Sequence, residues 1–184
     1  MILHRCFAWN QDARDDAADG PLWFPRIYQG EGRHDNPDTY GCLYLADRPV
    51  SCIVEQLGPF RGQRLVASIL RRRGLPLALA DIELDDTAAL VDLDDPVVLS
   101  GETLRPSLVA TRHRPVTQPQ ALALYHRHPG AAGLRWWSSW EALWTNVTLF
   151  DRVMPKLRLA GIRMLTLDDP ALLKAADVFG LRVA

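Results

Sequence analysis

The chain has 184 residues, of which 48% are hydrophobic and 23% charged, and its formal net charge is -1. This length and composition fit one globular domain, and the near-neutral charge argues against a general binder of polyanions. The three cysteines form neither a metal-binding nor a disulfide pattern, which indicates a reducing compartment. No leader sequence or long apolar run is evident, so we expect a soluble, cytoplasmic protein without membrane contact.

Hydrophobic periodicity predicts a mixture of strands and helices, separated by loops that are rich in polar residues, Gly and Pro. The expected strands are 2–8, 42–45, 77–84, 89–93, 161–167 and 181–183. The expected helices are 49–60, 64–73, a short helix and turn in 96–107, 118–127, and a last helix that begins at 168–170. Because these elements do not alternate as regular βαβ units, we predict an α+β fold, in one compact domain with a mixed sheet and flanking helices.

The segment 33–55 has the character of a site. Arg33, Tyr44 and Glu55 follow one another at equal steps of eleven residues. They place a cation before a predicted strand, an aromatic hydroxyl on it and a carboxylate on the next helix. Glu55 falls within the apolar run of that helix, where burial of a carboxylate without a partner would be costly. From these residues alone, a structural ion pair between Arg33 and Glu55 remains the alternative.

The segment 133–150 is the second notable stretch, because it holds four of the six tryptophans. The polar residues Ser138, Ser139 and Asn146 lie among them and need hydrogen-bond partners if they are buried. Tryptophans at this density are usually core residues. A structural role and a binding role therefore both remain open for this stretch.

Other charged segments favour structural roles. The basic cluster 112–114 is interpreted as a loop before Pro115, and the cluster 71–73 as the C-terminal end of helix 64–73. Seven acidic residues between Asp81 and Asp95 alternate with apolar residues, which is typical of an exposed sheet face rather than of a metal site. Motifs for phosphate loops, dinucleotide binding, zinc proteases and serine hydrolases are also absent. These absences argue against the common nucleotide hydrolases, dehydrogenases and metalloenzymes, and we expect no metal.

Several short motifs in order resemble the RES domain, a family named for its arginine, glutamate and serine. They are an arginine in the opening strand (Arg5), then 32–37, 43–46, 54–55 and 133–139. The resemblance covers about residues 3–168 of a single domain that spans 1–184. It implies a fold similar to that of ADP-ribosyltransferases.

The chain departs from the family pattern in two places. The family often has Gly-Arg-aromatic-Asn-Pro where this chain has His34-Asp35-Asn36-Pro37, so either Asp35 or Asn36 fills the polar position, with Asn36 favoured. Two serines follow the tryptophans, and Ser138 is favoured over Ser139 as the motif serine.

The resemblance implies the toxin of a type II toxin–antitoxin system. Such a toxin degrades NAD by cleaving the nicotinamide–ribose bond, as a glycohydrolase or a phosphorylase. The implied partners are NAD and an Xre-type antitoxin, with inorganic phosphate as a candidate co-substrate and neither a further cofactor nor direct binding of nucleic acid. Two alternatives stay open, namely an ADP-ribosyltransferase that modifies a protein and a catalytically silent scaffold that binds NAD or the antitoxin. The acceptor of the ADP-ribose (water, phosphate or a protein) stays open as well.

The resemblance also implies roles for individual residues. The expected catalytic residues are Arg33, Tyr44 and Glu55, and the expected NAD-binding residues are Arg5, Arg33, Asn36, Tyr44, Ser138 and Asn146. Cleavage of this bond develops positive charge on the ribose, which a fixed carboxylate such as Glu55 would stabilise. An arginine fork suits the pyrophosphate, for which Arg5 and Arg33 are candidates.

Overall fold

The computed structural model describes residues 1–182, and they form two compact units. The first unit contains residues 1, 24–44 and 84–157, and the second contains 2–23, 45–83 and the described residues from 158 onward. The boundary falls inside strand β2 (Cys42–Ala46). The predicted α+β class is confirmed, whereas the extent of a single domain over residues 1–184 stays a prediction.

The first unit is built on strands in the order β2-β7-β6-β5. Here β7 is Thr145–Phe150, β6 is Gly133–Trp137 and β5 is Leu90–Asp92. Strand β6 pairs antiparallel with β7 and parallel with β5, so the predicted mixed sheet is confirmed. The helices of this unit are α2 (Pro96–Gly101), α3 (Pro106–Ala110) and α4 (Arg114–Arg127), and short 3-10 turns lie at Arg26–Tyr28 and Asp151–Lys156.

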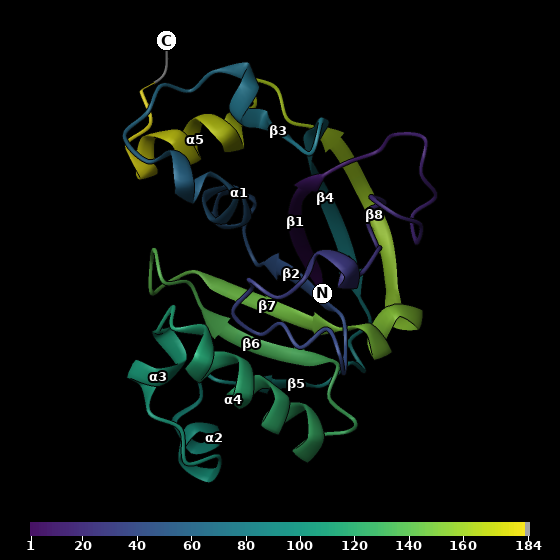
Figure 1. Ribbon diagram of the computed structural model, residues 1–184, viewed down its shortest axis with the longest axis vertical. Helices are drawn as coiled ribbons and strands as arrows, with labels where there is room; N and C mark the ends of the chain where they lie inside the picture. The colour runs from purple at the N-terminus through teal and green to yellow at the C-terminus, as the bar shows by residue number, and fades with distance from the viewer. Residues whose placement is uncertain (183–184) are drawn as a thin grey trace. The chain divides into compact units, whose positions relative to one another are not determined.

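Helix α4 runs along β5 and β6 and covers one face of these strands (Figure 1). Its buried residues Ala121 and Leu124 belong to the same core cluster as Leu134 of β6. The rings of Tyr40 and Phe150 extend this cluster, with their centroids 4.7 Å apart. The apolar side of α4 therefore fixes the helix, and with it the loop that precedes the helix, on the sheet.

The second unit contains β1 (Ile2–Ala8), β3 (Arg71–Arg72), β4 (Leu75–Leu84) and most of β8 (Leu157–Met164). Strand β1 lies antiparallel to β4, with Arg5 opposite Ala80, and it also pairs with β2 through His4 and Ala46. Strand β8 pairs with β4. Helix α1 (Pro49–Leu57) continues into a 3-10 turn (Gly58–Phe60) and packs against β1 and α5 (Pro170–Phe179).

The predicted helix over 64–73 is wrong. The segment forms a 3-10 turn (Ala67–Leu70) followed by β3, which pairs antiparallel with β4. Arg73 and Gly74 have φ angles of 50° and 81°, and this left-handed turn reverses the chain into β4. The spacing of apolar residues indicated a helix, but pairing with a neighbouring strand overrides such a local preference. The cluster 71–73 is consequently not the end of a helix.

Two further boundaries differ from the prediction. The strand expected at 161–167 begins at Leu157 and ends at Met164. Of the strand expected at 181–183, Val183 lies outside the described residues, and Arg182 makes only an isolated bridge with Arg64. Across residues 1–182, no helix is both long and apolar enough to cross a bilayer.

The predicted start of the last helix is confirmed, and Asp169 caps it. Its carboxylate accepts hydrogen bonds from the N–H groups of Ala171 at 2.8 Å and Leu172 at 3.3 Å, and from Nε of Arg163 at 2.9 Å. We expect Asp169→Ala to lower the free energy of unfolding by about 1–2 kcal/mol in urea denaturation, because this cap is lost. The exposed Asp177 on the same helix is the matched control, with an expected effect below about 0.5 kcal/mol for Asp177→Ala. Equal effects of the two variants would contradict the capping role.

Candidate functional site

The segment 30–36 forms a tight loop around the buried carboxylate of Asp35. This carboxylate accepts hydrogen bonds from the N–H groups of Gly30 at 2.8 Å and Gly32 at 2.7 Å, and from the hydroxyl of Tyr44 at 2.7 Å. A Cβ at Gly32 would lie 2.5 Å from both Asp35 Oδ1 and the Tyr44 oxygen, which leaves no room for a side chain. The glycine of the motif is therefore required by this close approach.

The hydroxyl of Tyr44 holds the loop at two points. It donates to Asp35 and accepts the backbone N–H of His34 at 2.9 Å. Burial, followed by the neighbouring Cys42 and Asp35, raises the pKa of Tyr44 well above its ordinary value. The hydroxyl therefore stays protonated, and both of its hydrogen bonds hold the loop, while the catalytic role of Tyr44 stays a prediction.

Asn36 is tied inward as well. Its Nδ2 lies 2.8 Å from the hydroxyl of Tyr40, 3.0 Å from the carbonyl oxygen of Gln118 and 3.3 Å from that of His34. Tyr40 in turn donates to the same His34 carbonyl at 2.8 Å. Both Asp35 and Asn36 thus stabilise the loop, and the assignment of Asn36 to the polar position of the family stays a prediction.

Arg33, at the centre of the loop, has a fixed guanidinium group. Its Nη1 donates to the carbonyl oxygens of Val109 at 2.6 Å and Thr111 at 2.7 Å, and the group lies 4.5 Å from the ring centroid of Trp136. Its backbone carbonyl accepts the hydroxyl of Thr117 at 2.6 Å. The cation is therefore held in one orientation before any ligand arrives.

The indole of Trp136 beneath Arg33 is itself fixed by a buried hydroxyl. Oγ1 of Thr148 accepts Nε1–H of Trp136 at 3.0 Å and forms a hydrogen bond with Nδ1 of His34 at 2.8 Å. The rings of His34 and Trp136 meet edge to face, with centroids 5.2 Å apart. Burial, together with the charge of Arg33, lowers the pKa of His34 to about 3. The imidazole is thus neutral near pH 7.

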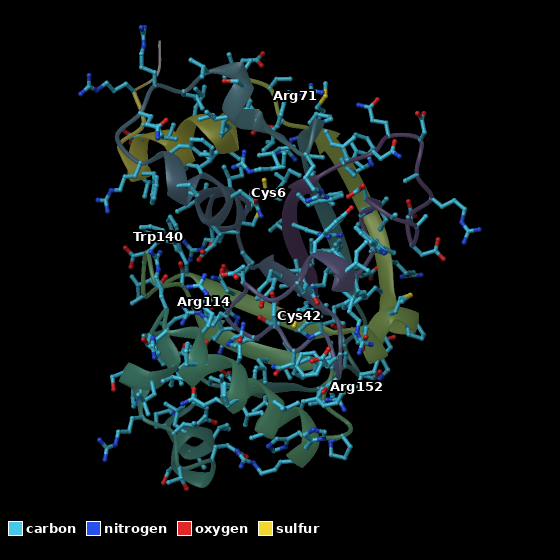
Figure 2. All side chains as sticks on the ribbon, in the orientation of Figure 1. Cys6, Cys42, Arg71, Arg114, Trp140 and Arg152 are labelled. Atoms are coloured by element: carbon cyan, nitrogen blue, oxygen red, sulfur yellow. The ribbon has the colours of Figure 1, made fainter. Side chains whose placement is uncertain are left out.

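The two serines of the 133–139 motif have different surroundings at the turn between β6 and β7. Ser138 is 2% exposed, and its Oγ accepts the N–H of Trp140 at 3.1 Å. Oγ of Ser139 accepts Nε–H of Arg112 at 3.0 Å. Ser138 therefore closes the turn, whereas Ser139 meets an arginine from another segment. Figure 2 shows Trp140 in this turn.

Asn146 is buried on β7, where it pairs with Trp136 of β6 in the strand register. The two strands approach each other closely. A Cβ at Gly133 would lie 2.1 Å from the carbonyl oxygen of Thr148, so glycine is required there. The first unit thus holds five of the predicted site residues: Arg33, Asn36, Tyr44, Ser138 and Asn146.

Arg5 and Glu55 lie in the second unit, and the structure does not join them to each other. Nη1 of the buried Arg5 donates to the carbonyl oxygens of Gly20 at 3.1 Å and Pro21 at 2.6 Å. Burial lowers the pKa of Arg5 to about 9, so the group is still charged near pH 7. Cys6, the next residue of β1, lies near α1 (Figure 2). Because side chains alternate along a strand, Arg5 points away from α1, the helix that carries Glu55.

Glu55 is exposed on α1, although its helix neighbours Ile53, Val54 and Leu57 are buried. The apolar face of the helix therefore leaves the carboxylate outside the core, and the expected cost of burial does not arise. An exposed carboxylate is accessible to a ligand.

Sequence reasoning missed three contributors to this arrangement: His34, Thr148 and Arg112. A threonine on a strand carries no signal of its own, and the partners of His34 and Arg112 lie far along the chain. The basic cluster 112–114 is also not simply a loop, because α4 begins at Arg114 rather than at 118. Pro115 accounts for the earlier start, since proline suits the first turn of a helix.

In residues 1–182, no group of three His, Cys, Asp or Glu side chains is placed to hold a metal ion.

Comparison with known proteins identifies the family. The sequence matches the RES domain family over residues 2–170, and the chain therefore belongs to that family. A solved structure described as the crystal structure of the M. tuberculosis MbcT-MbcA toxin-antitoxin complex contains a chain of similar fold, with a TM-score of 0.66 and 17% identity. The match covers 97% of this chain and 88% of that chain, and at such low identity it shows the fold alone. No curated protein sequence matches the chain.

We expect Tyr44→Phe to destabilise the protein by about 1–3 kcal/mol, because it leaves the His34 N–H unpaired and removes a donor from the Asp35 carboxylate. Urea denaturation measures this effect. Tyr125→Phe is the matched control, because the Tyr125 hydroxyl makes no hydrogen bond with any residue in 1–182. A loss for Tyr44→Phe no larger than that for Tyr125→Phe would contradict the positioning role.

His34 should make stability depend on pH. An unfolded histidine titrates near pH 6.5, whereas native His34 has a pKa of about 3, so the unfolded state binds more protons between these values. The free energy of unfolding therefore falls as the pH is lowered through this range. We expect a shallower fall for His34→Asn, which keeps a polar group near Thr148 but does not titrate. Urea midpoints from about pH 4 to pH 7 measure it, and an equal change for the exposed His126→Asn would contradict burial as the cause.

Proposed function

We propose that this chain is the toxin of a type II toxin–antitoxin pair and that it degrades NAD by cleaving the nicotinamide–ribose bond. Membership of the RES domain family and the similarity of fold to a chain of a toxin–antitoxin complex support this proposal. The observation that carries it is the fixed guanidinium of Arg33. Two carbonyl oxygens and an indole face hold this cation at the family motif.

The reaction requires stabilisation of positive charge. As the nicotinamide–ribose bond breaks, charge grows on the anomeric carbon and the ring oxygen, while nicotinamide leaves as a neutral molecule. A general acid is therefore not essential, and a fixed carboxylate lowers the barrier by electrostatic stabilisation. Glu55 takes this role in our proposal. It could also orient the attacking water or phosphate, as carboxylates do in glycosidases.

Arg33 binds the pyrophosphate of NAD in this proposal. A guanidinium donates charge-assisted, bidentate hydrogen bonds to phosphate oxygens. Because the Arg33 side chain is already ordered, little conformational entropy is lost when the ligand binds. Asn36, Ser138 and Asn146 are further NAD-binding residues in our proposal.

Tyr44 acts as a positioning residue in our proposal. Both hydrogen bonds of its hydroxyl are made within the loop, to Asp35 and His34. The raised pKa of the hydroxyl also keeps it protonated at neutral pH, so Tyr44 is not positioned to act as a general base. Tyr44 would therefore affect catalysis through the placement of Arg33.

The proposed protein partner is an antitoxin. The similar solved chain comes from a structure described as a toxin–antitoxin complex. The Xre type of this partner follows from the family resemblance. The proposed enzyme needs NAD as substrate and no further cofactor.

We expect Glu55→Gln to fold normally and to lose about 10²–10³ in the rate of NAD consumption, because the neutral amide cannot stabilise the developing charge. An assay of NAD loss with the purified variants measures this. Glu83→Gln, on β4 of the same unit, is the matched control and should retain the wild-type rate. A wild-type rate in Glu55→Gln would exclude Glu55, and no NAD consumption by the wild-type chain would overturn the proposed function.

The products identify the acceptor. Mass spectrometry after incubation with NAD, with and without phosphate, distinguishes the three reactions. ADP-ribose alone indicates hydrolysis, and ADP-ribose 1″-phosphate indicates phosphorolysis. An added ADP-ribose mass on a protein indicates transfer, whereas thermal protection by NAD that remains intact indicates a silent binding scaffold.

A further inference from the structure

Arg112 is an exposed arginine whose guanidinium is nevertheless held in place. It lies between α3 and α4, and its guanidinium carbon is 3.7 Å from the ring centroid of Trp140. Its Nε donates to Oγ of Ser139 at 3.0 Å. A free arginine side chain on a surface carries about 2 kcal/mol of rotamer entropy. The indole and the hydroxyl restrict Arg112, so it is arranged much as Arg33 is on Trp136.

The terminal nitrogens of Arg112 are available to a ligand. Nη1 and Nη2 make no hydrogen bond with any residue in 1–182, and no carboxylate there forms an ion pair with this group. Stacking on Trp140 occupies a face of the guanidinium and Ser139 occupies Nε, which leaves the outer edge of the fork. That edge carries the two parallel donors with which arginine binds phosphate oxygens.

Arg112 and Arg33 are linked through one short segment, 109–112. The carbonyl oxygens of Val109 and Thr111 accept the hydrogen bonds of Arg33, and Arg112 follows directly after Thr111. The backbone of Arg112 is fixed as well, because its carbonyl accepts Nη1–H of Arg114 at 2.8 Å. Figure 2 shows Arg114 and Trp140 on the same side of this unit. The segment 109–112 thus binds the guanidinium group of Arg33 and carries that of Arg112.

We propose that Arg112 is a second phosphate-binding residue, which holds the pyrophosphate of NAD together with Arg33. This inference rests on the proposed function and adds a residue to it. A pyrophosphate has two phosphoryl groups, and in this proposal one guanidinium group binds each of them. Arg112 also suits this role better than Arg5 does, because the side chain of Arg5 is buried whereas that of Arg112 is exposed.

The test compares binding of ADP-ribose, by titration calorimetry, with the kinetics of NAD cleavage. We expect Arg112→Ala to raise the Kd for ADP-ribose and the KM for NAD by about 10- to 100-fold, the range for lost charge-assisted hydrogen bonds. The kcat should change much less, because Arg112 does not contact the reacting bond. Arg112→Lys keeps the cation over Trp140 but lacks the fork, so its Kd should lie between those of the wild type and Arg112→Ala.

The matched control is Arg105→Ala, which removes the same charge from an exposed site before α3 and should leave the Kd unchanged. Equal Kd values for Arg112→Ala and Arg105→Ala, in a wild-type chain that binds ADP-ribose and cleaves NAD, would overturn this inference alone. A wild-type chain that neither binds ADP-ribose nor cleaves NAD would overturn the proposed function as well. If Arg112→Ala does not fold, wild-type binding by Arg112→Lys would show that the fork is not needed and would refute the inference.

Discussion

The buried carboxylate of Asp35 is the group on which the candidate site depends. A buried carboxylate is unfavourable unless hydrogen bonds satisfy it, and here two backbone N–H groups and the hydroxyl of Tyr44 do so. These hydrogen bonds join the loop 30–36 and strand β2 at the carboxylate of Asp35. The loop consequently has a single conformation, which places Arg33 against Trp136.

Two arginines of the first unit, Arg33 and Arg112, are held in place by different groups. Arg33 is held by carbonyl oxygens and an indole, whereas Arg112 is held by an indole and a hydroxyl. For Arg112, these contacts leave Nη1 and Nη2 without a hydrogen bond to any residue in 1–182. The tryptophans of the 133–150 stretch have the structural role that the sequence left open, whereas the binding role of this stretch stays a prediction. They are part of the packed hairpin, and two of them also orient arginines.

Local signals predicted the elements that have local causes. Pro49 and Asp169 mark the starts of α1 and α5, since a proline in the first turn and an aspartate cap act through adjacent backbone groups. The helix predicted over 64–73 was wrong, because the apolar spacing of this segment fits a helix whereas the segment pairs with β4, which lies later in the chain. A spacing rule does not include the hydrogen bonds of a neighbouring strand.

The sequence by itself determined the α+β class, the RES family and the residue types of the site, because these depend on patterns within short segments. Only the tertiary structure decided what each residue does. Arg33 meets Val109 across 76 positions, and His34 meets Thr148 across 114. The tertiary structure also showed that Glu55 is exposed, that Arg5 is bound by its own unit and that Arg112 is ordered on Trp140. The physical reason is that hydrogen bonds and ring contacts depend on distance in space, and separation along the chain does not determine that distance.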